Sequence, residues 1–140
     1  MAPVDDLPAS HRLILDSGGV IALARGSFDA RAALERARRQ GYVVVIPTPV
    51  VAEVHRGGHD HAKIDRILKA VDATLPTSEF IARRAGELQA AAGTSDPVDA
   101  IVVAEALAAV PAVIVTSDAS DIRQLLDTQT DGARVAVVAV

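Results

Sequence analysis

Short apolar runs alternate with longer amphipathic stretches along most of the chain. Unbroken runs of Val, Ile, Leu and Ala predict four strands, at residues 13–15, 43–46, 112–115 and 135–138, and a weaker one at 73–75. Because the runs are continuous rather than alternating, they predict strands that are buried on both faces, as in a parallel sheet.

Helical periodicity fills the segments between these strands. Helices are predicted at residues 28–40, 49–56, 61–71, 78–92, 97–109 and 119–127, with a further short helix starting near Gly19. Gly41 just past one helix and Pro97 at the start of another are typical of helix ends. Strands that alternate with helices predict an α/β domain with right-handed crossovers, here over residues 11–140, preceded by a loose N-terminal arm at 1–10.

Composition and charge narrow the class of protein. The length of 140 residues fits one domain. The net charge of −4 divides into +2 over residues 1–70 and −6 over 71–140, which argues against a uniformly basic nucleic-acid clamp. The lack of cysteine excludes disulfide scaffolds, thiolate metal sites and thiol catalysis, and three aromatic residues are too few for base-stacking platforms.

Targeting and membrane signals are also missing from the sequence. The start, MAPVDDLP, lacks the basic and then apolar order of a signal peptide. The longest apolar stretch, near residues 106–115, contains Pro111 and is shorter than the ~20 residues that cross a bilayer. We therefore expect a cytoplasmic protein with no membrane partner.

Acidic residues follow most of the predicted strands. In chain order they are Asp16, Glu53, Asp96, Asp99, Asp118 and Asp121. The carboxyl ends of parallel strands share one edge of the sheet, where ligands bind in open α/β folds. The sequence therefore predicts that these carboxylates converge.

Each acid also has a purely structural reading. Asp16, Asp96 and Asp118 stand where helix N-caps belong, and Asp121 stands in a first helical turn. Asp99 is harder to explain in this way, because it shares a helix face with apolar residues and a carboxylate there needs a partner. Glu53 lies similarly among valines.

A cluster of such carboxylates has a definite chemistry. Two carboxylates ~5 Å apart repel by about 3 kcal/mol at an effective dielectric constant near 20, so the cluster must take up protons or cations. Ligands that are all oxygen select a hard ion, Mg²⁺ or Mn²⁺. Such ions activate water and stabilise a transferring phosphoryl group, which points to phosphodiester hydrolysis.

Four motifs carry a family resemblance. They are LILDSGGVIAL with Asp16, TPVVAEVHR with Glu53, DPVDAIVVAEAL with Asp99, and VTSDASDIRQL with Thr116 and Asp118. In order, spacing and strand context, the chain from about residue 12 to 138 resembles the PIN-domain ribonucleases, in particular the VapC-type toxins. One departure is Gly18, since the family often has a hydroxyl residue there; Ser17 offers one next to it.

The resemblance implies an α/β/α sandwich with a mainly parallel sheet and an endoribonuclease that depends on Mg²⁺ or Mn²⁺. It implies that Asp16, Glu53, Asp99 and Asp118 hold the metal and that Asp96 or Asp121 assists. It also implies a homodimer and a small antitoxin partner, as in type II toxin–antitoxin pairs.

Other residues complete the hypothesis. Ser17, Thr116 and Ser117 are candidates to hydrogen-bond the ligating carboxylates, and Arg25 and Arg56 are candidates for RNA phosphate contacts at the rim. The alternative is a catalytically inactive PIN-like binding module. The histidines at 55, 59 and 61 flank Gly57-Gly58, which favours a solvated loop over a zinc site.

Overall fold

The computed structural model describes residues 11–140, so the expected N-terminal arm at residues 1–10 lies outside the described residues. Five parallel strands form one sheet in the order β3-β2-β1-β4-β5. The strands are β1 (Arg12–Leu15), β2 (Val43–Pro47), β3 (Ala73–Leu75), β4 (Ala112–Thr116) and β5 (Val135–Ala139).

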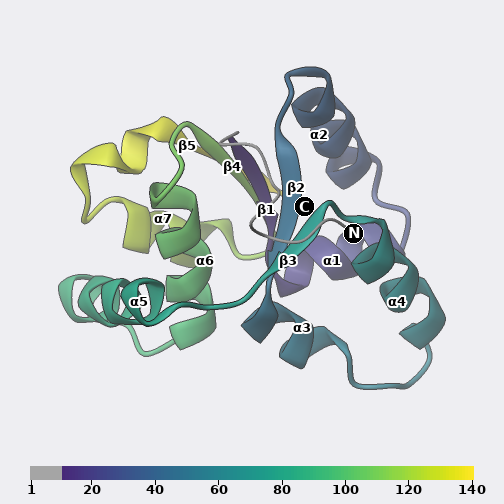
Figure 1. Cartoon of the computed structure of the whole chain (residues 1–140), viewed down its shortest axis with the longest axis horizontal. Helices are drawn as coiled ribbons and strands as arrows, with labels where there is room; N and C mark the ends of the chain where they lie inside the picture. The colour runs from purple at the N-terminus through teal and green to yellow at the C-terminus, as the bar shows by residue number, and fades with distance from the viewer. Residues whose placement is uncertain (1–10) are drawn as a thin grey trace.

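Helices cover both faces of the sheet (Figure 1). They are α1 (Ser17–Ala24), α2 (Phe28–Arg39), α3 (Thr48–Val54), α4 (His61–Ala70), α5 (Glu79–Ala92), α6 (Pro97–Leu107) and α7 (Ala119–Leu126), with a 3₁₀ helix η2 (Thr130–Arg134) before β5. In Figure 1, α1 to α4 lie on the right of the sheet and α5 to α7 on the left. The expected three-layer α/β/α architecture is confirmed.

The predicted strands are all present because their apolar runs form the core. Leu13, Ile14 and Leu15 of β1 are fully buried, as are Val44 and Ile46 of the neighbouring β2. Burial on both faces explains why these runs do not alternate with polar residues.

The helix boundaries differ from the predictions by a few residues. The helix predicted near Gly19 begins at Ser17, and the helix predicted at 49–56 spans Thr48–Val54. The 3₁₀ helix η2 was not predicted, because its sequence, TDGAR, has no apolar periodicity. No helix in the part of the chain from residue 11 onward has the length and apolar character to cross a bilayer.

Two glycines make a matched test of the packing around η2. A Cβ on Gly132 would overlap the backbone carbonyl of Leu126, whereas a Cβ on Gly86, in the middle of α5, would meet nothing within 4 Å. We expect Gly132→Ala to lower the free energy of unfolding by about 2 kcal/mol because the backbone must shift. Gly86→Ala should raise it by about 0.5 kcal/mol through helix propensity. Urea unfolding of both variants checks this, and equal effects would contradict the packing around η2.

Candidate metal centre

The carboxylates gather where the order of the strands reverses. From β1 the chain builds β2 and β3 to one side of the sheet, and later β4 and β5 to the other side. This reversal separates the loop after β1 from the loop after β4, and α/β folds bind ligands in such crevices. Asp16 follows β1 and Asp118 follows β4 at this point.

Asp16 is the buried member of the group, with 4% of its surface exposed. It is the N-cap of α1, and its Oδ1 accepts a hydrogen bond from the Gly19 amide at 2.8 Å. The hydroxyl of Thr116 also bonds to this carboxylate, and the same hydroxyl oxygen accepts the Asp118 amide at 2.8 Å. Burial raises the pKa of Asp16, the two hydrogen bonds lower it, and the charges of Asp118 and Glu53 raise it again.

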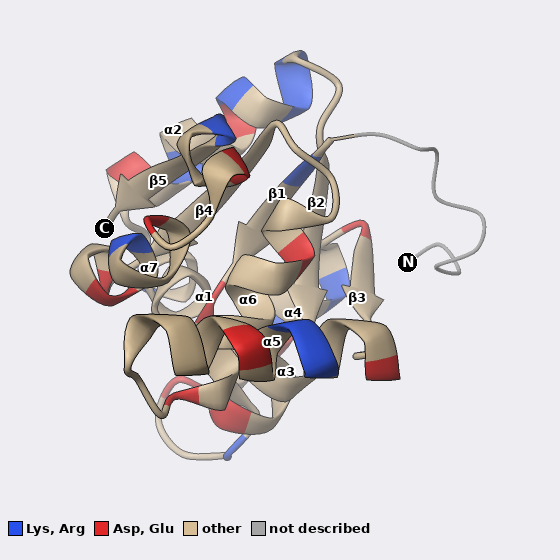
Figure 2. Ribbon diagram, turned by 90° about the vertical axis from the view of Figure 1, so that its left-hand side faces the viewer, with Lys and Arg blue, Asp and Glu red and all other residues tan. Residues whose placement is uncertain are grey.

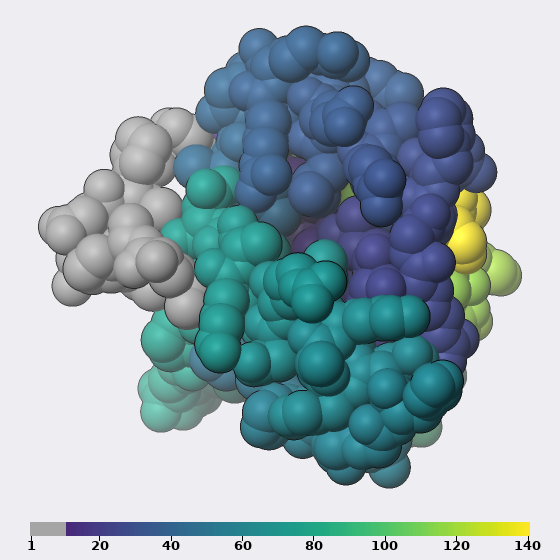
Figure 3. All heavy atoms as spheres, turned by 90° about the vertical axis from the view of Figure 1, so that its right-hand side faces the viewer, coloured from purple at the N-terminus to yellow at the C-terminus, as the bar shows by residue number. Residues whose placement is uncertain are grey.

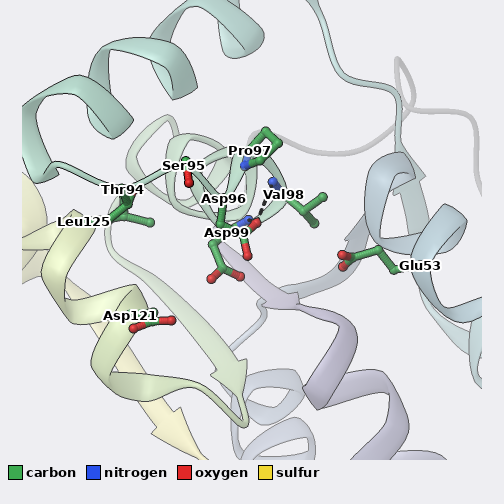
Figure 4. A pocket seen from close by; sticks show the side chains of 9 residues that line it. All are labelled: Glu53, Thr94, Ser95, Asp96, Pro97, Val98, Asp99, Asp121 and Leu125. Carbon is green, nitrogen blue, oxygen red and sulfur yellow. Dashed lines mark hydrogen bonds between the residues drawn. The ribbon is translucent and has the colours of Figure 1, made fainter.

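Three further carboxylates approach one another more closely. Asp99 on α6 and Asp118 and Asp121 at the start of α7 each offer an oxygen, and these oxygens lie within 4.8 Å of one another. Figure 4 shows Asp99 and Asp121 turned toward the same space, with Glu53 approaching from the other side. Asp118 occupies the N-cap position of α7 but makes no capping hydrogen bond with its side chain, so its carboxylate is not needed to begin the helix.

This crowding changes the acidity of the group. The pKa of Asp99 is raised to about 7, first by burial and then by the charges of Asp96, Asp16, Asp118 and Asp121. The pKa of Asp118 is raised by desolvation, by the charge of Asp121 and by a hydrogen bond between these two carboxyls. The site therefore favours the uptake of a proton or a cation, because either one reduces the repulsion between its carboxylates.

Asp96 has the capping role that its position before Pro97 suggests. Its Oδ1 accepts the amides of Val98 and Asp99, both at 3.1 Å, so it is the N-cap of α6. It also lines the cleft, where its charge acts on Asp99. Asp96 thus positions the start of α6, on which Asp99 lies.

Glu53 reaches the cleft from α3 and is held there by Ser17. The Ser17 hydroxyl donates a hydrogen bond to Oε1 of Glu53. The side chain of Ser117 fills the place that a Cβ on Gly18 would take. A larger residue at position 18 would therefore displace Ser117, and this explains why glycine follows Ser17 in this chain.

The cleft has about 600 Å³ of volume and extends beyond the carboxylates. Thr94, Ser95, Pro97 and Leu125 also line it, as Figure 4 shows. A space of this size is typical of small-ligand sites. The cleft therefore combines carboxylates with uncharged side chains.

The two arginines expected at the rim have different surroundings. Arg25 forms an ion pair with Asp60 at 3.1 Å, whereas Arg56 is exposed just past the end of α3. The rings of His55 and His61 lie 5.1 Å apart. These two histidines belong to no cluster of three or more possible metal ligands. Within residues 11–140, such a cluster is formed by Asp99, Asp118 and Asp121 alone.

The structure gives Asp121 a more central position than the sequence suggested. It was expected only to assist, yet it stands with Asp99 and Asp118 in the tightest cluster, while Asp16 and Glu53 flank that cluster. The spacing of Asp118 and Asp121 could have indicated this position, because residues three apart on a helix share a face. An acid in a first helical turn is common for other reasons, so this signal is weak.

The donor set fits a hard divalent cation. Every candidate ligand is a carboxylate oxygen, the preference of Mg²⁺ and Mn²⁺. Two full charges 4.8 Å apart repel by about 3 kcal/mol at an effective dielectric constant near 20. A cation would relieve this repulsion, which adds to burial in raising the pKa of Asp99.

Comparisons with known proteins agree with the fold. A solved structure described as "Crystal structure of PAE2754 from Pyrobaculum aerophilum" is similar, with a TM-score of 0.56 and 17% identity over 91% of this chain and 83% of that one. No curated protein sequence matches the chain. The PIN domain model matches residues 13–125, and PIN domains are in general nucleases that act on RNA. The chain therefore belongs to the PIN-domain family.

Proposed function

We propose that this protein is an endoribonuclease that hydrolyses RNA phosphodiester bonds and depends on Mg²⁺ or Mn²⁺. The observation that carries the proposal is the convergence of Asp99, Asp118 and Asp121 within 4.8 Å, beside the buried Asp16, in a cleft of a PIN-family chain. A bound divalent cation supplies Lewis acidity and an activated water for attack on the phosphodiester.

The residues of the chain have distinct tasks in this proposal. Asp16, Glu53, Asp99 and Asp118 would hold the cation, and Asp121 would join them from the next turn of α7. Thr116 fixes the orientation of Asp16 through its hydroxyl, and the same hydroxyl holds the backbone of Asp118. A bound cation would make the cleft less negative, so that an RNA phosphate can enter.

The uncharged side chains of the cleft would contact the nucleotide next to the scissile phosphate. The hydroxyl of the exposed Ser95 can bond to ribose or base. Arg56, exposed beside Glu53, would meet a neighbouring phosphate. Arg25 would do so only after it leaves Asp60.

The direct test uses purified protein and a mixed pool of structured RNAs. We expect cuts within RNA chains in the presence of Mg²⁺ or Mn²⁺, no cuts in excess EDTA, and no cuts in a DNA pool of the same sequences. Failure of pure, folded protein to cut RNA with either ion would contradict the nuclease proposal and favour a PIN-like binding module.

Ser17 gives a second test, aimed at the position of Glu53. We expect Ser17→Ala to reduce cleavage about tenfold, because Glu53 loses the hydroxyl that holds it in the cleft. Ser17→Thr keeps the hydroxyl and should restore most of the rate. Cleavage at several Mg²⁺ concentrations measures the effect, and equal rates for Ser17→Ala and the unaltered protein would remove Ser17 from the site.

We further propose that the protein acts in the cytoplasm as the toxin of a type II toxin–antitoxin pair, as a homodimer neutralised by a small antitoxin. The support is the resemblance of its four acidic motifs to VapC-type toxins. Induced expression in a bacterial host should stop growth, and the Asp99→Asn variant should not. Unimpaired growth with intact, active protein would contradict the toxin role but not the nuclease activity.

A further inference from the structure

One part of the sheet is left without a covering helix. On the left-hand side of Figure 1, α7 packs against β5, whereas on the other side α1 and α2 pack against β1, β2 and β4. Figure 3 views this second side, and the C-terminal residues, in yellow, remain visible at its margin beside α1 and α2. The outer strand of the sheet is therefore covered on one face only.

A groove of about 430 Å³ lies between α2 and β5. Its apolar part includes Ala33 and Ala37 on α2 together with Val113, Ala136 and Val138 on β4 and β5. Ala136 is exposed and Val138 is only half-buried. This is an apolar surface of the kind that a partner segment covers.

Three arginines surround this apolar surface. Arg36 comes from α2, Arg123 from α7, and Arg134 directly precedes β5; all three are exposed. None of them has an ion-pair partner among residues 11–140, and no carboxylate lines the groove. The groove therefore has positive charge available for an acidic ligand.

The backbone of β5 adds a third feature. This strand pairs with β4 on one side and has no neighbouring strand on the other within the described part of the chain. Its sequence, VAVVA, has none of the charged or proline residues that usually protect an edge. An extended peptide can add to such an edge by main-chain hydrogen bonds and place alternate side chains against the neighbouring face.

The groove is separate from the acidic cleft. Its residues lie near the starts of β4 and β5, whereas the carboxylates follow the ends of the strands. Figure 2 shows α2, with its blue basic residues, at the top of the molecule and α3, which carries Glu53, at the bottom. A ligand in this groove would leave the cleft open.

We propose that the groove between α2 and β5 binds an extended, acidic segment of a partner protein as a sixth strand on β5. Every second side chain of the bound segment packs on Ala136 and Val138. Carboxylates of the segment form ion pairs with Arg36, Arg123 and Arg134. The apolar surface and the free strand edge favour a peptide over nucleic acid, which would need stacking surfaces that Tyr42 alone offers here. A second copy of this chain is disfavoured, because a symmetric pairing presents the same surface from both copies, and this surface carries three arginines and no carboxylate.

The experiment uses an eight-residue blocked peptide of alternating Asp and Val, with a Lys–Val peptide of the same length as its control. We expect the acidic peptide to shift the amide NMR signals of β5 and of the C-terminal half of α2 in the ¹⁵N-labelled protein. The Lys–Val peptide should not shift them. Shifts confined to other elements, or equal binding of the two peptides, would overturn the proposal.

Variants locate the binding surface. The double variant Arg36→Ser, Arg134→Ser should weaken binding of the acidic peptide at least tenfold, whereas Arg31→Ser, Arg83→Ser, with the same loss of charge elsewhere, should weaken it less than threefold. Ala136→Glu should also weaken binding at least tenfold by placing a carboxylate in the groove. Well-dispersed NMR spectra of each variant verify folding.

Nucleic acid is the competing ligand. A single-stranded RNA octanucleotide, added in EDTA so that it stays intact, should leave the β5 signals in place. If the RNA shifts these signals and the acidic peptide does not, the groove is a nucleic-acid contact and the proposal is wrong. Neither result depends on the nuclease activity of the cleft.

Discussion

Replacement of Asp99 by asparagine is expected to abolish RNA cleavage, with a loss of at least about a thousandfold in rate. Asp99 lies at the centre of the cluster, within 4.8 Å of the oxygens of Asp118 and Asp121 and within the electrostatic reach of Asp16. The amide keeps the size of the side chain but removes the charge that a divalent cation needs. Initial rates on the same RNA pool at saturating Mg²⁺ and Mn²⁺ measure the effect.

The same substitution should stabilise the cation-free protein. The pKa of Asp99 lies near 7 in the folded state against 3.8 for an ordinary aspartate, so the folded protein holds this proton more tightly than the unfolded one. Stability from this group is therefore fully present below pH 4 and is lost as the pH rises toward 7. At pH 8, Asp99→Asn should raise the free energy of unfolding by about 2 kcal/mol, after an allowance for solvent screening.

Asp131→Asn is the matched control for both effects. Asp131 is an exposed acid in η2, and it contributes to neither the cleft nor the carboxylate cluster. We expect it to change neither cleavage nor the pH dependence of stability. An Asp99→Asn protein that cuts RNA at the original rate would exclude the proposed role of this cluster in hydrolysis.

Cation binding is expected to depend on pH about thirtyfold. A cation must displace the proton from Asp99, whose pKa near 7 leaves it mostly protonated at pH 5.5 and mostly charged at pH 8. The apparent affinity for Mn²⁺ should therefore be about thirty times weaker at pH 5.5 than at pH 8. Isothermal titration calorimetry in buffers of different ionisation enthalpy measures both the affinity and the protons released.

Thermal unfolding is an independent measurement of cation binding. At a cation concentration of 100 times the dissociation constant, the folded state gains about 2.7 kcal/mol. The unfolding midpoint should rise by several degrees at pH 8 and hardly at all for Asp99→Asn. A rise of the same size at both pH values and in both proteins would mean that the cation binds elsewhere.

The sequence was informative about the fold because burial acts on continuous segments. The apolar runs that became β1, β2 and β4 were recognisable without the structure, since each is covered on most of its surface. The run that became β5 was recognisable by its apolar composition, although the strand is only partly covered. The 3₁₀ helix η2 was not recognisable, because its position depends on the contact between Gly132 and the Leu126 carbonyl rather than on its own pattern.

The position of the candidate carboxylates at one edge of the sheet was predictable, but their contacts were not. Strand order alone brings Asp16 and Asp118 to one edge, and the sequence indicates which residues follow the strands. The contact between Ser17 and Glu53 joins residues 36 positions apart, and the place of Ser117 depends on the missing side chain of Gly18. Such contacts depend on loop geometry, which hydrophobic periodicity does not specify.

The pairing of β1 with β4 has a consequence for synthesis of the protein on the ribosome. Leu13 pairs with Val113, so the central crevice closes only when strands 100 positions apart in the sequence meet. A nascent chain that ends before β4 already contains Asp16, Glu53 and Asp99, but it lacks the strand that places Asp118 beside them. If the proposed nuclease function holds, the growing polypeptide would therefore lack a complete site until β4 has joined the sheet.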